Sequence, residues 1–283
     1  FSLVLPLLIL NRRIGNESLV ILGGMLGMTI LGVIDDRYDL KPVLKLAGQV
    51  LVTGLFLAGG IQVHITQVPA VDIVLSTLWL VGMTNAFNFV DSMDGLAVGL
   101  AGISAAFFML VTIDSSQPAL ALLSAAILGS CAGLFFFNVT PAQLFLGDSG
   151  AQALGVTLAA VAIAYTPGQA GLPQALTWFI PILVLGVPIF DMVLVIVSRL
   201  RAHLRVYLAR QDHVYHRLVG LGLDSTRAVA AMQLCAILLG LLGFISLELT
   251  TLQANLLFGA TIIAGIILIV VLEKMLNGEQ TES

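Results

Sequence analysis

Long apolar runs separated by short polar connections dominate this chain. A helix needs about 20 mostly apolar residues to cross the hydrocarbon core of a bilayer. The runs predict helices at the partial segment 1–10 and near 18–34, 43–60, 71–90, 95–113, 118–137, 150–166, 176–198, 229–247 and 252–272. The pattern therefore predicts an all-α integral membrane protein, a polytopic bundle of about ten transmembrane helices.

The composition agrees with this prediction and excludes a soluble fold. Hydrophobic residues make up 59% of the 283 positions and charged residues 10%, and the mean hydropathy is +1.06. The first apolar run, Phe1 to Leu10, is too short to span a bilayer, so we expect the first helix to be incomplete. No repeat is evident, so we expect one membrane-embedded domain over 1–283 with one elaborated loop over 199–228.

The twelve basic residues are distributed unevenly among the connections. Only Arg12 and Arg13 belong to one set of alternate connections. The other set carries the remaining ten, which are Arg37, Lys41, Lys45, Arg199, Arg201, Arg205, Arg210, Arg217, Arg227 and Lys274. Cytoplasmic loops of membrane proteins carry an excess of Lys and Arg. The sequence therefore predicts a multi-pass protein of the cell membrane whose second set of connections faces the cytoplasm.

The segment TNAFNFVDSMDGL, residues 84–96, sets two amides and two carboxylates at the end of an apolar run. Asn85, Asn88, Asp91 and Asp94 are spaced by three, so neighbouring members share one drifting face of a helix. An Asp at the centre of a bilayer costs about 2.5 to 3.5 kcal/mol. We therefore expect these side chains at a wet interface or around a cation, as half of an active site.

Two further acidic positions lie on the same predicted side. Asp35 and Asp36 end the run 18–34, and a lone pair of this kind is usually a solvated helix end. Adjacent carboxylates repel each other, and a nearby cation or metal relieves the repulsion. Because the other clusters lie on the same side, we interpret the pair as part of the site.

The segment FLGDSG places Asp148 between two glycines at the start of an apolar run. Asp148 or Ser149 is suited to capping the first-turn amides of a helix, which is one interpretation. A helix N-terminus also binds phosphate, and a carboxylate there can hold Mg²⁺ against phosphate oxygens. We favour the second interpretation.

The loop over 199–228 contains six of the basic residues and the pair His213 and His216, followed by Arg217. Zinc binding is disfavoured because no Cys lies nearby and no third ligand is evident. Arg and imidazole donors match phosphate oxygens, so a diphosphate fits better.

Asp191 lies eight residues before Arg199, about 12 Å along a helix. It is either a buried carboxylate paired to a neighbouring helix or a functional group.

Five ordered motifs, DDRYDLKPVLK, TNAFNFVDSMDGL, FLGDSG, PIFD and DHVYHRLVGLGL, lie on the same predicted side. Together they resemble the polyprenyl-phosphate N-acetylhexosamine-1-phosphate transferases, which include undecaprenyl-phosphate GlcNAc-1-phosphate transferases and phospho-MurNAc-pentapeptide translocase. The resemblance implies a bundle of ten or eleven helices that moves a sugar phosphate from a UDP-sugar to polyprenyl (undecaprenyl) phosphate. It further implies Mg²⁺, with Mn²⁺ as an alternative, release of UMP, a role in starting cell-envelope glycans, and no nucleic-acid partner. A homodimer is left open.

The resemblance also implies roles for individual residues. It implies that Asp148 and Asn88 bind the metal, and that Asp91 and Asp94 line the nucleoside pocket with Phe145 stacked on uracil. It places Asp35 and Asp36 near the lipid phosphate, and His213 with His216 in the basic loop motif. Asn85 and Arg217 are expected to bind substrate beside them, and the acidic pairs and both histidines are the expected catalytic groups. Ser92 and Tyr215 depart from the family pattern, which has Gly and His there, and we expect the family's first helix to be missing from this sequence.

Other classes fit the residues less well. A cation-coupled transporter should show polar residues on both sides of the midplane and broken helices in related halves, and the sequence shows neither. An intramembrane aspartyl protease motif requires Gly at the position where this chain has Phe145. A CMP-releasing phosphotransferase would carry its carboxylates on one or two adjacent helices, whereas here they are spread over four connections. A one-step displacement and a covalent acyl-phosphate route both stay open.

Overall fold

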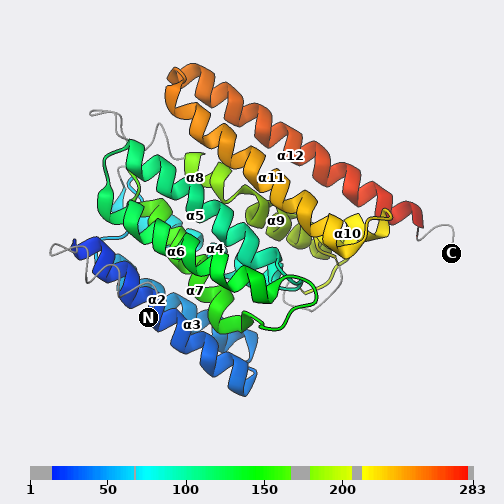
Figure 1. Ribbon diagram of the computed structural model, residues 1–283, viewed down its shortest axis with the longest axis horizontal. Coiled ribbons are helices and arrows are strands. Elements are labelled where there is room, and N and C mark those ends of the chain that lie inside the picture. Colours follow the sequence, from blue (N-terminus) through cyan, green and yellow to red (C-terminus); the bar gives the residue numbers. More distant parts are fainter. Residues whose placement is uncertain (1–14, 67, 167–178, 206–211, 280–283) are drawn as a thin grey trace.

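The computed structural model describes residues 15–66, 68–166, 179–205 and 212–279, and over these ranges it is helical with no β-strand (Figure 1). The apolar runs end at Pro, Gly and polar clusters, which is why one helix follows another with short connections. The first elements are α2 (Asn16–Tyr38), α3 (Pro42–Ala58), α4 (Pro69–Val90), α5 (Leu96–Asp114), α6 (Pro118–Asn138) and α7 (Gly147–Ala164). They are followed by α8 (Phe179–Val184), α9 (Gly186–Arg201), α10 (Val214–Gly220), α11 (Ser225–Ile245), a 3₁₀ turn (Ser246–Glu248) and α12 (Thr251–Glu279).

The protein is a multi-pass membrane protein. Within the described ranges, seven helices are long and apolar enough to cross a membrane, and α3 is apolar but shorter. The predicted total of about ten spans is not confirmed. The predicted partial helix over 1–10, together with Arg12, Arg13 and Arg210, lies outside the described residues.

The predicted span over 176–198 is broken where it is described, between α8 and α9 at Leu185. Pro188 causes the break, because it has no backbone N–H to donate to the carbonyl of Val184 four residues earlier. The hydroxyl of Ser104 on α5 donates to that carbonyl at 3.1 Å. The freed carbonyl is thus satisfied inside the bundle, as backbone at membrane depth requires.

Helix α7 lies between α2 and α4 and packs against both. A Cβ on Gly32 of α2 would lie 2.3 Å from the Cα of Ser149, and one on Gly155 would lie 2.6 Å from the carbonyl oxygen of Met83 on α4. Small residues allow such close approach of helix backbones in membranes. These contacts set the N-terminus of α7 beside the C-terminal ends of α2 and α4.

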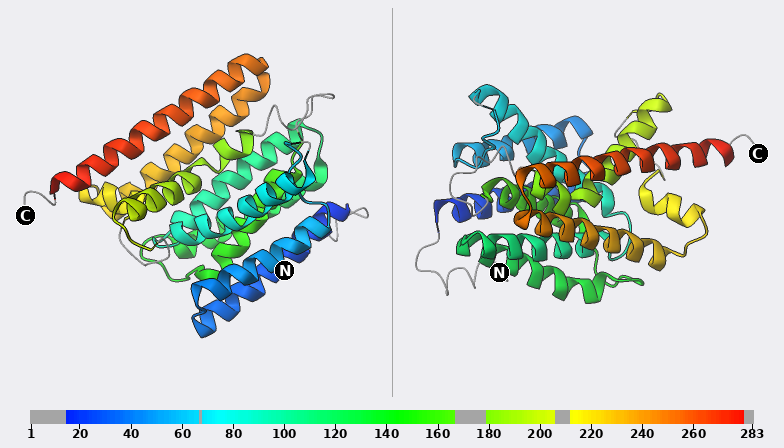
Figure 2. Two further views of the ribbon diagram at one scale, coloured as in Figure 1. Left: turned by 180° about the vertical axis from the view of Figure 1, so that it is seen from behind. Right: turned by 90° about the horizontal axis from the view of Figure 1, so that it is seen from above.

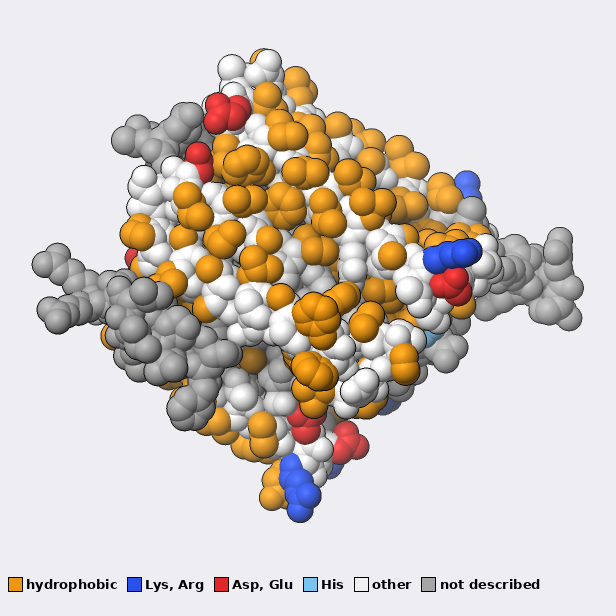
Figure 3. Space-filling view, in the orientation of Figure 1, with side chains coloured by type: hydrophobic (Ala, Val, Ile, Leu, Met, Phe, Trp, Pro, Cys, Tyr) orange, Lys and Arg blue, Asp and Glu red, His pale blue; other side chains and the backbone are white. Residues whose placement is uncertain are grey.

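The remaining helices enclose this centre. Figures 1 and 2 show α11 and α12 as an antiparallel pair along one side of the molecule and α2 with α3 along the other. Apolar side chains cover the middle of the face in Figure 3, and charged side chains lie toward its edges. Such an apolar belt is suited to contact with lipid tails.

Candidate active site

A cavity of about 350 Å³ opens where α2, α4 and α7 meet the two connections 91–95 and 138–146. This volume is in the range of small-molecule sites. Six of the predicted site residues line it, namely Asp36, Asn88, Asp91, Asp94, Phe145 and Asp148. The structure thus brings together residues that the sequence predicted from separate connections.

The ammonium group of Lys45 on α3 links two of the predicted carboxylates. Its Nζ lies 2.7 Å from Asp35 Oδ2 and 2.7 Å from Asp148 Oδ2. With the Asn88 amide oriented to satisfy both neighbours, its Nδ2 donates to Asp148 Oδ1 at 2.7 Å and its Oδ1 accepts from Lys45 at 3.2 Å. The sequence analysis counted Lys45 only as a cytoplasmic charge and missed this contact.

Asp36 caps helix α7 from a different helix. Its two carboxylate oxygens accept from the backbone N–H groups of Asp148 and Ser149 at 2.9 and 3.1 Å. Gly147 has φ +67°, and a Cβ there would lie 3.2 Å from Asp36 Oδ2, so a side chain would be strained. The capping interpretation of Asp148 is therefore wrong, because Asp36 accepts from these amides and its negative charge interacts favourably with the helix dipole. The Asp148 side chain instead contacts Lys45 and Asn88.

The two connections that close the cavity are tied to each other. Asp94 Oδ2 accepts from the backbone N–H of Ala142 at 3.0 Å, and Asn138 Oδ1 accepts from the N–H of Gly95 at 3.0 Å. Burial, together with the charges of Asp148 and Asp36, raises the pKa of Asp91 to about 7. Phe145 is 74% exposed at the rim, where an aromatic ring is open to a ligand.

Asn85 is not among the residues that line the cavity. Its Nδ2 donates to Gln49 Oε1 at 2.7 Å, and Gln49 Nε2 donates to Gln152 Oε1 at 3.1 Å. Gln49 lies one turn after Lys45 and Gln152 one turn after Asp148, and both are fully buried. Its expected contact with substrate stays a prediction; in this structure its amide ties α4 to α3, which carries Lys45.

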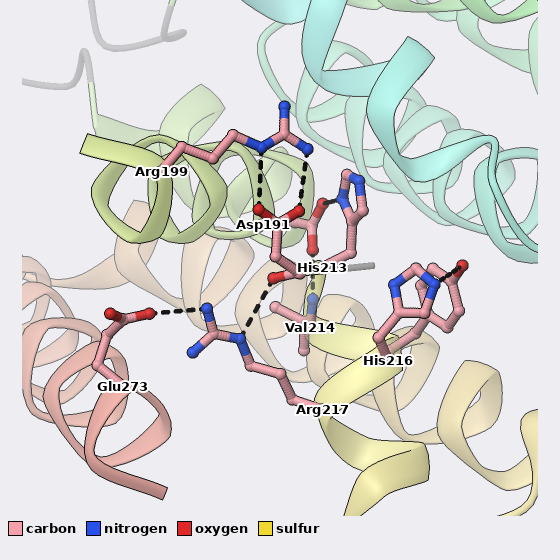
Figure 4. Close-up of polar contacts among 9 residues, drawn as sticks. Asp191, Arg199, His213, Val214, His216, Arg217 and Glu273 are labelled. Atoms are coloured by element: carbon pink, nitrogen blue, oxygen red, sulfur yellow. Dashed lines mark hydrogen bonds and ion pairs between the residues drawn. The ribbon is translucent and has the colours of Figure 1, made fainter. Parts of the chain in front are cut away.

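A second polar network lies around the start of α10 (Figure 4). Asp191 Oδ2 is 2.8 Å from His213 Nδ1, and its Oδ1 accepts from the N–H of Val214 at 2.7 Å. Asp191 is 1% exposed, so it is the buried, paired carboxylate that one of the two interpretations foresaw. The pairing fixes the His213 ring and leaves Nε2 as its other nitrogen.

Two arginines are held in the same network. Arg199 donates to both carboxylate oxygens of Asp212 at 2.9 Å each. Arg217 donates to the Asp212 carbonyl at 3.2 Å and to Glu273 of α12 at 2.7 Å, and both side chains of that ion pair are buried. Figure 4 shows Arg217 directed toward Glu273. Its expected contact with substrate stays a prediction, and the structure gives it a structural partner.

The network touches the cavity end of α4. The rings of Phe89 and His213 meet edge to face with centroids 5.9 Å apart. The Tyr215 hydroxyl lies 2.6 Å from His216 Nε2 and also hydrogen-bonds the Ser92 side chain. Burial raises the pKa of Tyr215, and burial with the neighbouring His213 lowers that of His216. The loop motif and the carboxylate cavity therefore adjoin, as the sequence predicted.

The donor atoms suit a hard cation better than zinc. Across the described residues, no group of three or more His, Cys, Asp or Glu side chains is placed to hold a metal ion. Asp148 and Asn88 offer a carboxylate and an amide oxygen, and a cation, the ammonium of Lys45, already lies between them. Mg²⁺ commonly takes one or two carboxylates and completes its shell with water and phosphate. The residues present therefore fit Mg²⁺.

A family model described as Glycosyl transferase family 4 matches residues 18–166. The chain is 31% identical over 217 residues to a "Probable undecaprenyl-phosphate N-acetylglucosaminyl 1-phosphate transferase" of Bacillus subtilis, covering 72% of this chain and 59% of that protein. It is 29% identical over 247 residues to a "Decaprenyl-phosphate N-acetylglucosaminephosphotransferase" of Mycobacterium leprae, covering 78% and 62%. With a "Phospho-N-acetylmuramoyl-pentapeptide-transferase" of Bacillus cytotoxicus the identity is 32% over 54% of this chain and 53% of that protein.

Proposed function

The chain belongs to glycosyl transferase family 4, and on that premise we propose that it transfers N-acetylhexosamine-1-phosphate from a UDP-sugar to polyprenyl phosphate. The names of the relatives support the lipid acceptor and the sugar phosphate. The chain spans about six-tenths of the length of the first two relatives, so the activity of the whole protein is part of the proposal. The UDP donor, the release of UMP and a role in starting cell-envelope glycans belong to it as well.

The observation that carries the proposal is the meeting of an anionic cavity with a histidine-bearing loop. The cavity supplies Asp91, Asp94 and the exposed ring of Phe145, which suit the hydroxyls and base of a nucleoside. The loop supplies His213, whose Nε2 is held in a fixed direction by Asp191. An anionic donor needs both kinds of group, since a cavity of carboxylates alone would repel it.

Asp148 and Asn88 would hold Mg²⁺, with Mn²⁺ as an alternative. When bound, such a cation neutralises charge on the diphosphate oxygens and polarises the phosphorus toward attack. Asp36 keeps the α7 N-terminus in place, so that Asp148 keeps its position. Lys45 supplies a second positive charge beside Asp35, where we place the acceptor phosphate.

The proposed reaction is a phosphoryl transfer. An oxygen of polyprenyl phosphate forms a bond to the phosphorus that carries the sugar, and the bond from that phosphorus to the UMP oxygen breaks. The second pKa of a phosphate monoester is about 6, so the attacking oxygen is already mostly ionised at neutral pH. The residues therefore need to position the substrates and screen charge, and a strong base is not required.

The site faces the cytoplasm of the cell in this proposal, because ten of the twelve basic residues lie on that set of connections. A cysteine replacing the exposed Lys41, between α2 and α3, should react with an impermeant thiol reagent only in inside-out vesicles. A cysteine replacing Gln117, at the other end of the bundle, should react only from outside. Reversed labelling would place the site on the other face.

A direct assay tests the activity. Purified protein is incubated with Mg²⁺, polyprenyl phosphate and a panel of UDP-sugars, and the lipid product is identified by mass. We expect a lipid that has gained one N-acetylhexosamine phosphate, with one UMP released for each. Folded protein that makes no lipid product from any donor, beside an active family member as a positive control, would contradict the proposal.

A further inference from the structure

We propose that Lys45 and a divalent cation compete for Asp148, so that the ammonium group leaves Asp148 when the metal binds and remains paired with Asp35. This inference rests on the metal assignment in the proposed function. It concerns how this chain's own residues respond to the metal, and it adds an internal counter-ion to the site.

The contacts of Lys45 carry the proposal. An ammonium group has three N–H donors. In this structure they face three oxygen atoms, those of Asp35 at 2.7 Å, Asp148 at 2.7 Å and Asn88 at 3.2 Å. Two of these three atoms belong to the groups assigned to the metal. The ammonium thus lies on the atoms that a divalent cation would use.

Both cations cannot hold these oxygens at once. Like charges a few Å apart repel, and the double charge of the metal ion doubles its repulsion with the ammonium group. The Asn88 Oδ1 already faces the cation position while its Nδ2 holds the other oxygen of Asp148. Exchange therefore needs movement of one side chain, the flexible stem of Lys45.

Asp35 explains why Lys45 stays nearby after the exchange. Its carboxylate is 6% exposed, and its Oδ1 is fixed by the N–H of Leu40 at 3.0 Å. A buried carboxylate without a cation is strongly destabilising. Lys45 therefore keeps Asp35 as its partner, and the donors released from Asp148 and Asn88 become available to an anionic oxygen entering beside Asp35.

The test measures metal affinity without substrates. Mn²⁺ binding to the purified protein is followed by electron paramagnetic resonance for the wild type, Lys45→Met and Lys45→Gln. Loss of the competing ammonium should tighten Mn²⁺ binding about tenfold in both variants. Lys41→Met, which removes an exposed lysine one turn earlier, is the matched control and should bind like the wild type. Mn²⁺ should also raise the melting temperature of Lys45→Met more than that of the wild type.

Unchanged or weaker Mn²⁺ binding in the Lys45 variants would overturn the inference, and so would tight binding that survives Asp148→Asn. Should the single variants fail to fold because Asp35 loses its partner, Asp35→Asn combined with Lys45→Met removes one charge of each sign and keeps the test. The transfer assay separates the two proposals. Lys45-sensitive binding in a protein without transfer rejects the proposed function alone, whereas transfer with Lys45-insensitive binding rejects the competition alone.

Discussion

The cavity at the ends of α2, α4 and α7 and the network around α10 both hold buried charge, but they balance it differently. In the cavity, Asp35 and Asp148 share the single ammonium of Lys45. In the network, each carboxylate has at least one basic side chain to itself: Asp191 has His213, Asp212 has Arg199, and Glu273 has Arg217. A shared cation can be exchanged, whereas matched buried pairs are costly to break.

The difference separates two tasks. The network joins α9, α10 and α12 and sets the direction of the His213 ring, so its charges serve the positions of other groups. The cavity retains more negative charge than Lys45 neutralises, which favours the arrival of a cation. Four substitutions test this contrast.

The largest expected effect is that of Asp148→Asn on turnover. Removing a group that holds the metal against the diphosphate should lower kcat by about 10²- to 10³-fold. The fold should persist, because the cap of α7 comes from Asp36. Turnover is measured in the lipid-product assay with a circular-dichroism check of folding, and Asp114→Asn, far along α5, is the control. Near-normal turnover would remove Asp148 from the metal site.

The next effect is one of stability. Glu273→Ala leaves the guanidinium of Arg217 buried without its anionic partner, which should lower the free energy of unfolding by about 3 to 5 kcal/mol. Protein that remains folded at low temperature should keep the wild-type KM for the UDP-sugar. Glu248→Ala, at an exposed acidic residue, is the control and should change stability little. A raised KM with normal stability would instead support Arg217 as a contact of the donor.

His213→Ala tests the one group of the network that we assign to the donor. Loss of a charge-assisted hydrogen bond to phosphate costs about 1.5 to 3 kcal/mol, so kcat/KM for the UDP-sugar should fall about ten- to a hundredfold. The KM for polyprenyl phosphate should change little. Saturation curves for both substrates, normalised to folded protein, make the measurement. A defect confined to the acceptor contradicts the assignment, and wild-type kinetics with reduced stability would make the loop an anchor only.

The last test concerns the pH dependence of stability through Asp91, whose pKa is raised to about 7. Between about pH 4 and 7 the folded protein binds a proton that the unfolded chain does not, so stability falls as the pH rises through this range. Asp91→Asn removes this contribution. The variant should melt above the wild type at pH 8 and together with it near pH 4. A difference that is constant with pH would contradict the raised pKa.

The meeting of the acidic clusters was predictable from the sequence because helices of similar length alternate direction. The contacts of Lys45 and Asp36 were not. Asp36 caps amides that lie 112 and 113 residues away, and no local pattern reports a cap supplied by another helix. Lys45 looked like any cytoplasmic charge, although Gln49, one turn later in an apolar helix, was a signal that this face is buried.

The same limit explains Arg217 and the broken span. His216 and Arg217 are neighbours in sequence, but successive helix residues do not face the same way. Arg217 therefore points away from His216 and meets Glu273 of α12. The break at Leu185 had a local signal in Pro188, whereas the hydroxyl that compensates for it, that of Ser104, came from a helix distant in sequence.

The close approach of α7 to its two neighbours has a consequence for which mutations the protein tolerates. Gly32 and Gly155 carry no functional atom, yet any side chain there would push against the backbone of Ser149 or Met83. In a random mutant library, substitutions of these two glycines should therefore be found among the inactive variants. The mostly exposed helix α12 should accept nearly any apolar residue. The position of Asp148 thus depends on two residues that have no side chain at all.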